Sequence, residues 1–260
     1  MSDRGFGVAA GLEPDVARPL AERCTELGYA SLWSNDHPGA KGLETLAEFA
    51  AAAGGVDLGV GVIALDRQSP GEIAGDIDRL GLDRSRLWLG VGAGFQDKPL
   101  TAMREALPEL REHLDGVRLV LAAMGPKMCA LAGAEYDGAF FNWMTPGFAR
   151  AAREKAEQGA RQAGREPPAV FGYVRTAAGE DAPRRLAKEE SFYRDLHDGY
   201  RNHFDRLGEP QGTVGVAVAD RTAAQAALAA YEDALDTVVV RGLASASVES
   251  MVAVAEAAAP

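Results

Sequence analysis

Short apolar runs alternate with amphipathic helical patterns along most of this chain. The run at 56–63 is apolar on both faces, as a buried parallel strand should be. Strict alternation of this kind predicts a parallel sheet with right-handed crossovers. The predicted strands cover residues 6–10, 29–34, 56–63, 86–91, 117–123, 137–143, 169–174, 213–219 and 237–241. The predicted helices cover residues 13–27, 44–53, 70–80, 99–115, 128–134, 146–163, 182–207, 222–235 and 245–258.

Eight such βα units favour closure into a (β/α)8 TIM barrel over an open doubly wound sheet. A barrel typically needs ~250 residues, so a chain of 260 residues predicts one α/β domain over 1–260. One stretch departs from the pattern, because 182–207 is a long helical segment dense in charge and aromatic residues, and 213–219 is a run that a simple barrel does not need. We therefore predict a helical insertion over 179–219, after the seventh barrel strand.

A histidine and an acid follow the second predicted strand. In parallel α/β proteins catalytic groups gather where the strands end, and Asp36 and His37 stand at such an end. A neutral imidazole can move a proton near neutral pH, and the Asp36 carboxylate can bind a cofactor or raise the basicity of the histidine. The structural alternative is a helix-capping aspartate beside a solvated histidine.

Glycine-rich backbone ends the fourth predicted strand. Gly92, Ala93 and Gly94 would let a flat ligand approach without a Cβ in the way. The dinucleotide fingerprint is a poor match, because Phe95 stands at its third glycine position. A tight barrel corner explains the glycines equally well.

A candidate anion site follows the fifth strand. Free N–H groups at a helix start, next to the Lys127 ammonium, would attract an anion. The alternative is an ordinary helix start, since proline suits the first turn. The residues of this loop are Gly125, Pro126, Lys127 and Met128.

Polar residues also end the later strands. Asn142 could bond a cofactor, and Arg175 with Thr176 could hold an oxyanion in the sector where barrels often bind phosphate. Arg241 ends the last strand, whereas Trp143 suits packing as well as a pocket wall. A basic rim from Arg184, Arg185 and Lys188 is a further option, although a solvated helix face explains these three residues better.

Charge and cysteine content narrow the class of protein. A net charge of −11 argues against nucleic acid or an anionic membrane as the main partner. Cys24 and Cys129 do not make a disulfide scaffold, and neither lies in a metal-ligand spacing, so we expect packed small residues and no metal site. The first residues lack a signal pattern and no stretch reaches a membrane span, which predicts a cytoplasmic protein.

Two motifs resemble the luciferase-like flavin/deazaflavin oxidoreductases. The segment 77–80, Ile-Asp-Arg-Leu, leads into 86–95, Arg-Leu-Trp-Leu-Gly-Val-Gly-Ala-Gly-Phe, and this is similar to the helix and strand four of that family. The segments 122–128 and 131–138 resemble its fifth and sixth units, and 237–241 resembles its last strand.

The resemblance implies a barrel that binds FMN or coenzyme F420 at its C-terminal mouth. It places the chain nearer the F420-dependent branch, where an Asp-His pair corresponds to Asp36 and His37, with the aspartate on the deazaflavin and the histidine moving the proton. It also implies a cis peptide at a bulge near Gly61-Val62, which makes Gly61, Val62 and Ile63 candidate cofactor contacts.

Two departures limit what the resemblance implies. The sugar-phosphate dehydrogenases of the branch have an acid where this chain has Phe95, so that substrate is disfavoured. The chain is also short for the family, so the pocket is open or is completed by a partner subunit.

The predicted function is an F420-dependent oxidoreductase that passes a hydride between the deazaflavin and a small organic substrate. His37 is the predicted catalytic residue. The alternatives are an FMN-dependent monooxygenase and a cofactor-binding protein without catalysis; a metal- or Schiff-base-dependent lyase fits less well. Apolar helices and the habit of the family favour a homodimer.

Overall fold

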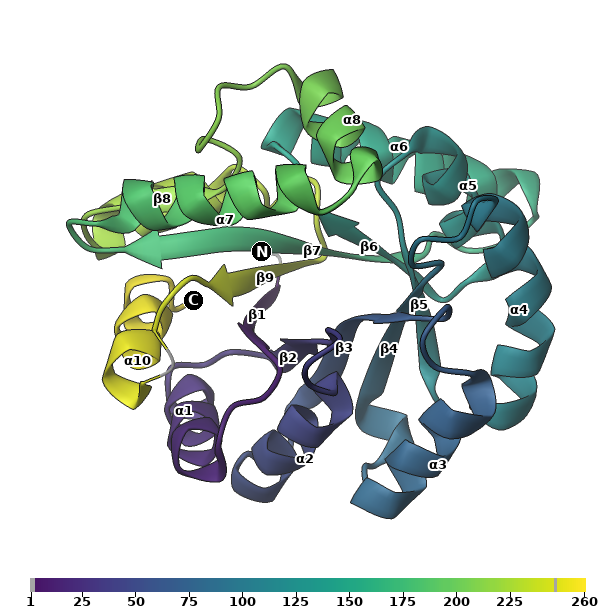
Figure 1. The fold of residues 1–260 in the computed structure, drawn as a ribbon, viewed down its shortest axis with the longest axis horizontal. Helices are drawn as coiled ribbons and strands as arrows, with labels where there is room; N and C mark the ends of the chain where they lie inside the picture. Colours follow the sequence, from purple (N-terminus) through teal and green to yellow (C-terminus); the bar gives the residue numbers. More distant parts are fainter. Residues whose placement is uncertain (1–2, 246) are drawn as a thin grey trace.

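Eight parallel strands close into a barrel. The structure, a computed structural model, describes residues 3–245 and 247–260. The barrel strands, in order around the ring, are β1 (Asp3–Ala9), β2 (Ser31–Asn35), β3 (Asp57–Ala64), β4 (Leu87–Gly92), β5 (Arg118–Ala122), β6 (Gly138–Asn142), β7 (Ala169–Ala178) and β9 (Thr237–Gly242). Closure comes from the pairing of β9 with both β7 and β1 (Figure 1). The predicted TIM barrel is confirmed.

Helices surround the barrel and bury its outer face. They are α1 (Pro14–Glu26), α2 (Gly42–Ala52), α3 (Pro70–Leu80), α4 (Pro99–His113), α5 (Pro126–Glu135), α6 (Pro146–Gln162), α9 (Arg221–Ala229) and α10 (Val248–Ala257). The start of α3 is fixed by a capping box, in which Ser69 accepts from the Glu72 N–H and Glu72 accepts from the Ser69 N–H. Cys24 and Cys129 are buried free thiols in the packed layer between strands and helices, as predicted.

Aromatic side chains fill the barrel. Trp33 is fully buried, and its ring centroid lies 5.1 Å from those of Phe140 and Phe171. A Cβ on Gly59 would lie 2.2 Å from the Trp33 ring, so only glycine fits beside this indole. Because the interior is packed, a ligand binds at the end of the barrel rather than inside it.

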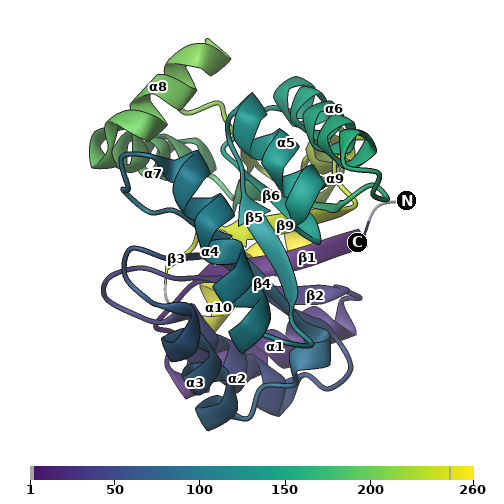
Figure 2. The same ribbon diagram turned by 90° about the vertical axis from the view of Figure 1, so that its right-hand side faces the viewer.

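The insertion after β7 packs over one edge of the mouth. It contains α7 (Ala182–Leu196), α8 (Asp198–Leu207) and the short strand β8 (Val216–Val218). β8 pairs with the last three residues of β7, beyond the part of β7 that pairs with β6, and Thr176 pairs with both β8 and β9. Figure 2 shows α7, α8 and the loop after β3 on one side of the barrel and the chain ends on the other.

The predicted single helix over 182–207 is wrong. The backbone at His197 is extended, with φ −163° and ψ 145°, and its Nδ1 accepts from the Gly199 N–H at 2.9 Å to begin α8. The ring of His197 also lies 4.7 Å from that of Phe95, centroid to centroid, which links the insertion to the loop after β4.

Other boundaries differ by a few residues. Helix α9 ends at Ala229 rather than at 235, and turns follow it. Helix α10 begins at Val248, while position 246 of the predicted helix lies outside the described residues. Strand β7 runs four residues past its predicted end at 174, because its last three residues pair with β8. Within 3–245 and 247–260 no helix has the length and apolarity needed to cross a membrane.

Candidate functional site

The alternation of side chains along each strand decides which residues reach the mouth. Tyr173 and Val239 belong to the aromatic cluster inside the barrel. Two positions further along the same strands lie Arg175 and Arg241, which therefore point inward at the C-terminal end. Thr176 lies on the opposite face of β7, where its hydroxyl donates to the Val174 carbonyl at 2.9 Å. Its side chain does not join the mouth.

Two amides hold the two guanidinium groups. Arg175 Nη1 donates to Asn142 Oδ1. Arg241 Nη2 donates to Asn35 Oδ1 at 3.1 Å, and its Nη1 donates to the Gly242 carbonyl at 2.8 Å. The structure thus brings Asn142 and Arg175 into contact, and it adds Arg241 and Asn35 from strands β9 and β2.

Aromatic rings enclose Arg175. Its guanidinium carbon lies 4.5 Å from the centroid of the Trp143 ring, 5.0 Å from that of Tyr193 and 5.4 Å from that of Tyr173. Burial raises the pKa of Tyr200, on α8, to about 12. This tyrosine and Tyr193 form the wall that the insertion contributes, and the Tyr200 hydroxyl stays protonated at neutral pH.

The floor of the mouth is positively charged. Arg175 is 2% exposed and Arg241 is 7% exposed, and the two are direct partners in the pairing of β7 with β9. Burial, and next the charge of Arg175, lower the pKa of Arg241. Among the described residues, no carboxylate forms an ion pair with either guanidinium, so this floor favours an anion.

Asp36 is tied to its own surroundings. Its Oδ1 forms an ion pair with Arg67, and its Oδ2 accepts from the Gly42 N–H at 3.1 Å, in the first turn of α2. The helix-capping alternative for Asp36 is therefore what the structure shows. Contact between Asp36 and a cofactor stays a prediction.

Both ring nitrogens of His37 are engaged by the backbone. Nδ1 accepts from the Gly39 N–H at 3.1 Å, so Nε2 carries the proton and donates to the Ala10 carbonyl at 3.3 Å. This arrangement fits the neutral ring with one defined tautomer. In this tautomer neither ring nitrogen is free, so proton transfer by His37 requires one of the two backbone hydrogen bonds to break.

The expected cis peptide is present at the end of β3. It joins Gly61 and Val62, where the pairing with β4 shifts register. Val62 packs against the barrel interior, whereas the Ile63 side chain is fully buried under the helices. Only the main chain of Ile63 is therefore available to a ligand at the mouth.

The glycines ending β4 lie close to protein atoms. A Cβ on Gly92 would lie 3.3 Å from Val62 and from Ala122, and one on Gly94 would lie 2.0 Å from Asp66 Oδ1. Gly94 has φ +63°, and Asp66 accepts from the Phe95 N–H at 2.9 Å. These contacts support the tight-corner interpretation, and contact of Gly92, Ala93 or Gly94 with a cofactor stays a prediction.

The loop after β5 is open. A Cβ on Gly125 would meet no atom within 4 Å, and no side chain caps α5, which begins at Pro126. Lys127 is exposed and Met128 is half-buried. The N–H groups of the first helical turn are thus free to donate hydrogen bonds to an anion at the rim.

Of the basic rim residues, two are solvated. The Arg184 side chain is 79% exposed and pairs with Asp181, and Lys188 is exposed. Arg185 instead donates to the Leu243 and Ala178 carbonyls and fixes α7 to the ends of two strands. The interpretation as a solvated face holds for Arg184 and Lys188 alone.

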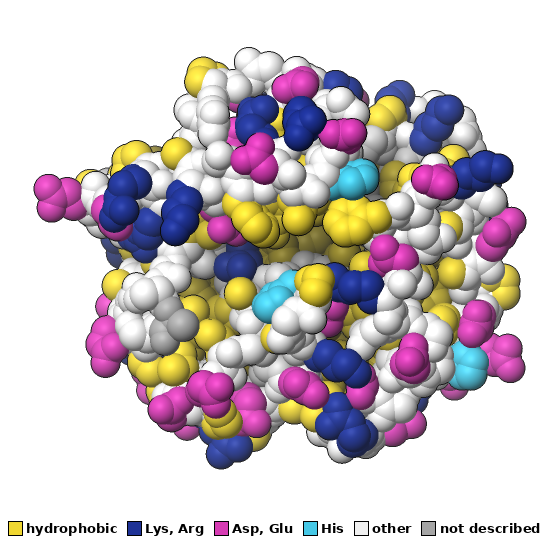
Figure 3. All heavy atoms as spheres, in the orientation of Figure 1, with side chains coloured by type: hydrophobic (Ala, Val, Ile, Leu, Met, Phe, Trp, Pro, Cys, Tyr) yellow, Lys and Arg dark blue, Asp and Glu magenta, His cyan; other side chains and the backbone are white. Residues whose placement is uncertain are grey.

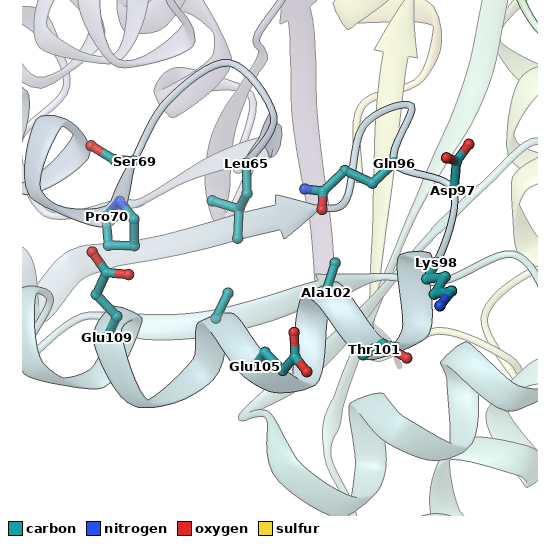
Figure 4. A pocket seen from close by; sticks show the side chains of 11 residues that line it. Leu65, Ser69, Pro70, Gln96, Asp97, Lys98, Thr101, Ala102, Glu105 and Glu109 are labelled. Carbon is teal, nitrogen blue, oxygen red and sulfur yellow. The ribbon is translucent and has the colours of Figure 1, made fainter.

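A hollow crosses the face that carries the mouth. Figure 3 shows it with a hydrophobic floor and with basic and histidine side chains at its edge. A separate groove of about 580 Å³ lies beside it, between the start of α3 and α4 (Figure 4). Glu105, Glu109 and Asp97 line that groove against a single cation, Lys98, so its charge is opposite to that of the arginines on the floor of the mouth.

Comparison with known proteins identifies the family. The profile of the luciferase-like monooxygenases matches residues 104–258. The chain belongs to the luciferase-like monooxygenase family.

A curated relative matches part of this luciferase-like chain. The chain is 26% identical over 185 residues to the 5,10-methylenetetrahydromethanopterin reductase of Methanolobus tindarius, covering 58% of this chain and 57% of that relative. It thus spans little more than half the length of that curated relative.

Solved structures share the fold. An F420-dependent secondary alcohol dehydrogenase with an F420-acetone adduct has a TM-score of 0.73 at 15% identity, covering 99% of both chains. The coenzyme F420 dependent tetrahydromethanopterin reductase of Methanopyrus kandleri has a TM-score of 0.72 at 18% identity, covering 93% of this chain and 94% of its own. A type II Baeyer-Villiger monooxygenase of Pseudomonas putida in complex with FMN has a TM-score of 0.68 at 14% identity, covering 100% and 99%.

In this luciferase-like barrel, sequence reasoning missed several residues around the mouth. Arg67, which pairs with Asp36, carried no signal beyond its position after β3. Tyr173 lies two positions before Arg175, and Asn35 lies two positions before His37. The alternation of side chains along a strand was therefore a usable signal for both. Tyr193 and Tyr200 come from the insertion, whose path no pattern reveals.

A buried histidine supports Trp143 at the edge of the mouth. His203 is 2% exposed, and its Nε2 lies 2.6 Å from the carbonyl of Trp143, a non-glycine residue with φ +54°. Burial lowers the pKa of His203. Below about pH 6.5 the unfolded chain takes up a proton at this residue that the folded chain does not, so the folded state loses stability as the pH falls.

We expect the free energy of unfolding to decrease from pH 7 to pH 5.5 more steeply in the wild type than in His203→Gln, by roughly 1.4 kcal/mol per pH unit at most. The glutamine amide can still donate to the Trp143 carbonyl. Urea titrations at several pH values measure the difference, with His113→Gln on the exposed end of α4 as the control. Parallel pH profiles of wild type and His203→Gln would contradict the expectation.

Proposed function

We propose that this chain is an F420-dependent oxidoreductase that transfers a hydride between the deazaflavin cofactor and a small organic substrate. The main support is the sequence similarity to a methylenetetrahydromethanopterin reductase, together with the fold of a tetrahydromethanopterin reductase that is F420-dependent. Membership of the luciferase-like family supports the coarser assignment, an oxidoreductase with a tricyclic cofactor.

The residues at the mouth fit such a cofactor. The hollow has a hydrophobic floor for a flat ring system (Figure 3), and the free N–H groups after Gly125 suit a phosphate. The backbone at Gly61-Val62 and at Gly92 lies at the same end of the barrel as Asp36. We assign cofactor contacts to these segments and to Asn142.

Each side chain then has a defined task. When bound, the deazaflavin ring supplies the hydride chemistry. His37 moves the accompanying proton through the imidazolium: Nδ1 accepts a proton once its ring leaves the Gly39 N–H, and the charged ring then returns a proton to regain the neutral form. Asp36 and Arg67 fix the loop that carries His37, and the aromatic walls exclude water.

Two alternatives rest on specific observations. An FMN-dependent monooxygenase is supported by the FMN complex that shares the fold. A binding protein without catalysis is supported by His37, since both of its ring nitrogens already have backbone partners.

A cofactor titration tests the proposal. We expect purified protein to bind F420 in the micromolar range and FMN and NADPH at least tenfold more weakly, measured by the change in cofactor fluorescence or absorbance. Binding of FMN alone would move the assignment to the monooxygenase. Tight F420 binding with no turnover on any substrate, and no change in His37→Gln, would support the binding protein.

A further inference from the structure

We infer that Arg175 and Arg241 together bind the carboxylate of an organic acid. That this acid is the substrate of the enzyme rests on the proposed function. The two guanidinium groups form a site of their own on the floor of the mouth. They are separate from the rim loop that suits a cofactor phosphate.

The backbone register forces the two cations together. Arg175 and Arg241 are direct partners on neighbouring strands, which lie about 4.8 Å apart, and both point into the barrel. Like charges at such positions destabilise a sheet. None of the ion pairs among the described residues involves either guanidinium, so the described protein leaves this pair of charges without a carboxylate partner.

Unused hydrogen-bond donors surround the pair. Arg175 Nε, Arg241 Nε, Trp143 Nε1 and the Tyr173 hydroxyl are buried and have no partner among the described residues. Three of these four groups can only donate. Such a set needs an acceptor with several lone pairs, and an anion meets that need and the charge together.

The shape of the site favours a carboxylate. Guanidinium groups bind planar oxyanions through paired N–H bonds, and the rings of Trp143, Tyr173 and Tyr193 hold Arg175 in place. The same rings offer an apolar surface to the carbon skeleton of an organic acid.

The position of the pair separates it from the cofactor loop. Residues 125–128 follow β5, and β6 stands between β5 and the neighbouring strands β7 and β9. Lys127 is solvated there, which suits a cofactor tail that extends into water. The two arginines are more than nine-tenths buried, which suits a small group held beneath the cofactor ring.

Calorimetric titration with benzoate and butyrate, at fixed ionic strength and with and without F420, tests the site. We expect saturable binding to the wild type, weakened at least 30-fold in Arg241→Met and at least tenfold in Arg241→Lys, which keeps the charge but loses the fork. The matched control is Arg150→Met, an exposed arginine of α6, with unchanged affinity. Arg241→Met removes one of two like charges, so its thermal midpoint should stay within a few degrees of the wild type.

Three results would overturn this assignment. They are no saturable binding of either acid in any condition, equal affinities in wild type and Arg241→Met, and competition between benzoate and F420, which would give the pair to the cofactor. Failure of the proposed function looks different: neither F420 nor FMN binds, while benzoate binding still depends on Arg241.

Discussion

Replacing Gly133 with leucine is expected to lower the free energy of unfolding by about 3 kcal/mol or more. Helices α5 and α6 cross with their backbones in near contact at this point. A Cβ on Gly133 would lie 1.8 Å from the Ala156 carbonyl oxygen, and one on Gly159 would lie 2.0 Å from that of Ala130. A backbone oxygen cannot turn aside as a flexible side chain can, so the two helices must separate.

Urea unfolding followed by circular dichroism measures this loss. The control is Gly147→Leu, since Gly147 lies in α6, is exposed, and a Cβ there would meet no atom within 4 Å. Gly133→Ala should fall between the two. Gly133→Leu should also weaken cofactor binding, because displacement of α5 moves the loop at Gly125. A wild-type midpoint for Gly133→Leu would mean that the helices do not cross this closely.

The largest effect on turnover is expected from His37→Gln, a decrease of roughly 100- to 10,000-fold in kcat, as for loss of a general acid or base. Glutamine can keep one hydrogen bond to the backbone but cannot exchange a proton near neutral pH. The affinity for F420 should stay within about threefold, since both ring nitrogens of His37 contact backbone groups rather than a charged group.

Steady-state kinetics with reduced and oxidised F420, once a substrate is known, checks this expectation, and His113→Gln serves as the distant control. Loss of cofactor affinity with unchanged kcat would assign His37 to binding instead. Unchanged kcat and affinity together would leave His37 as a structural residue that closes the turn with Ala40.

The fold could be predicted because its signals are local. Each strand is a short apolar run and each helix has its own start, as at Ser69, so the alternation alone indicates the barrel. The break at His197 was missed because helix-forming residues flank it on both sides. At the break His197 is extended and its imidazole accepts from the Gly199 N–H, and the Asp198-Gly199 pair was the available signal.

The site could be predicted only in part, since its main feature is non-local. Arg175 and Arg241 each end a strand, which the sequence shows, but their pairing depends on a register between segments 66 positions apart with the insertion between them. The bond from Arg241 to Asn35 spans 206 positions. Periodicity within a strand gives the direction of a side chain and says nothing of its neighbour. The dimer and the cytoplasmic location stay predictions.

Strand β7 is shared by two structural units, and this limits how the protein can be re-engineered. Its middle closes the barrel against β9, and its last residues carry β8. A miniaturised version that trimmed residues 179–218 to a short turn would remove β8 from the end of β7 and the Tyr193 ring from Arg175. The segment is thus no modular accessory to be grafted or deleted at will, and loop-swapping between relatives should keep it with its own β7.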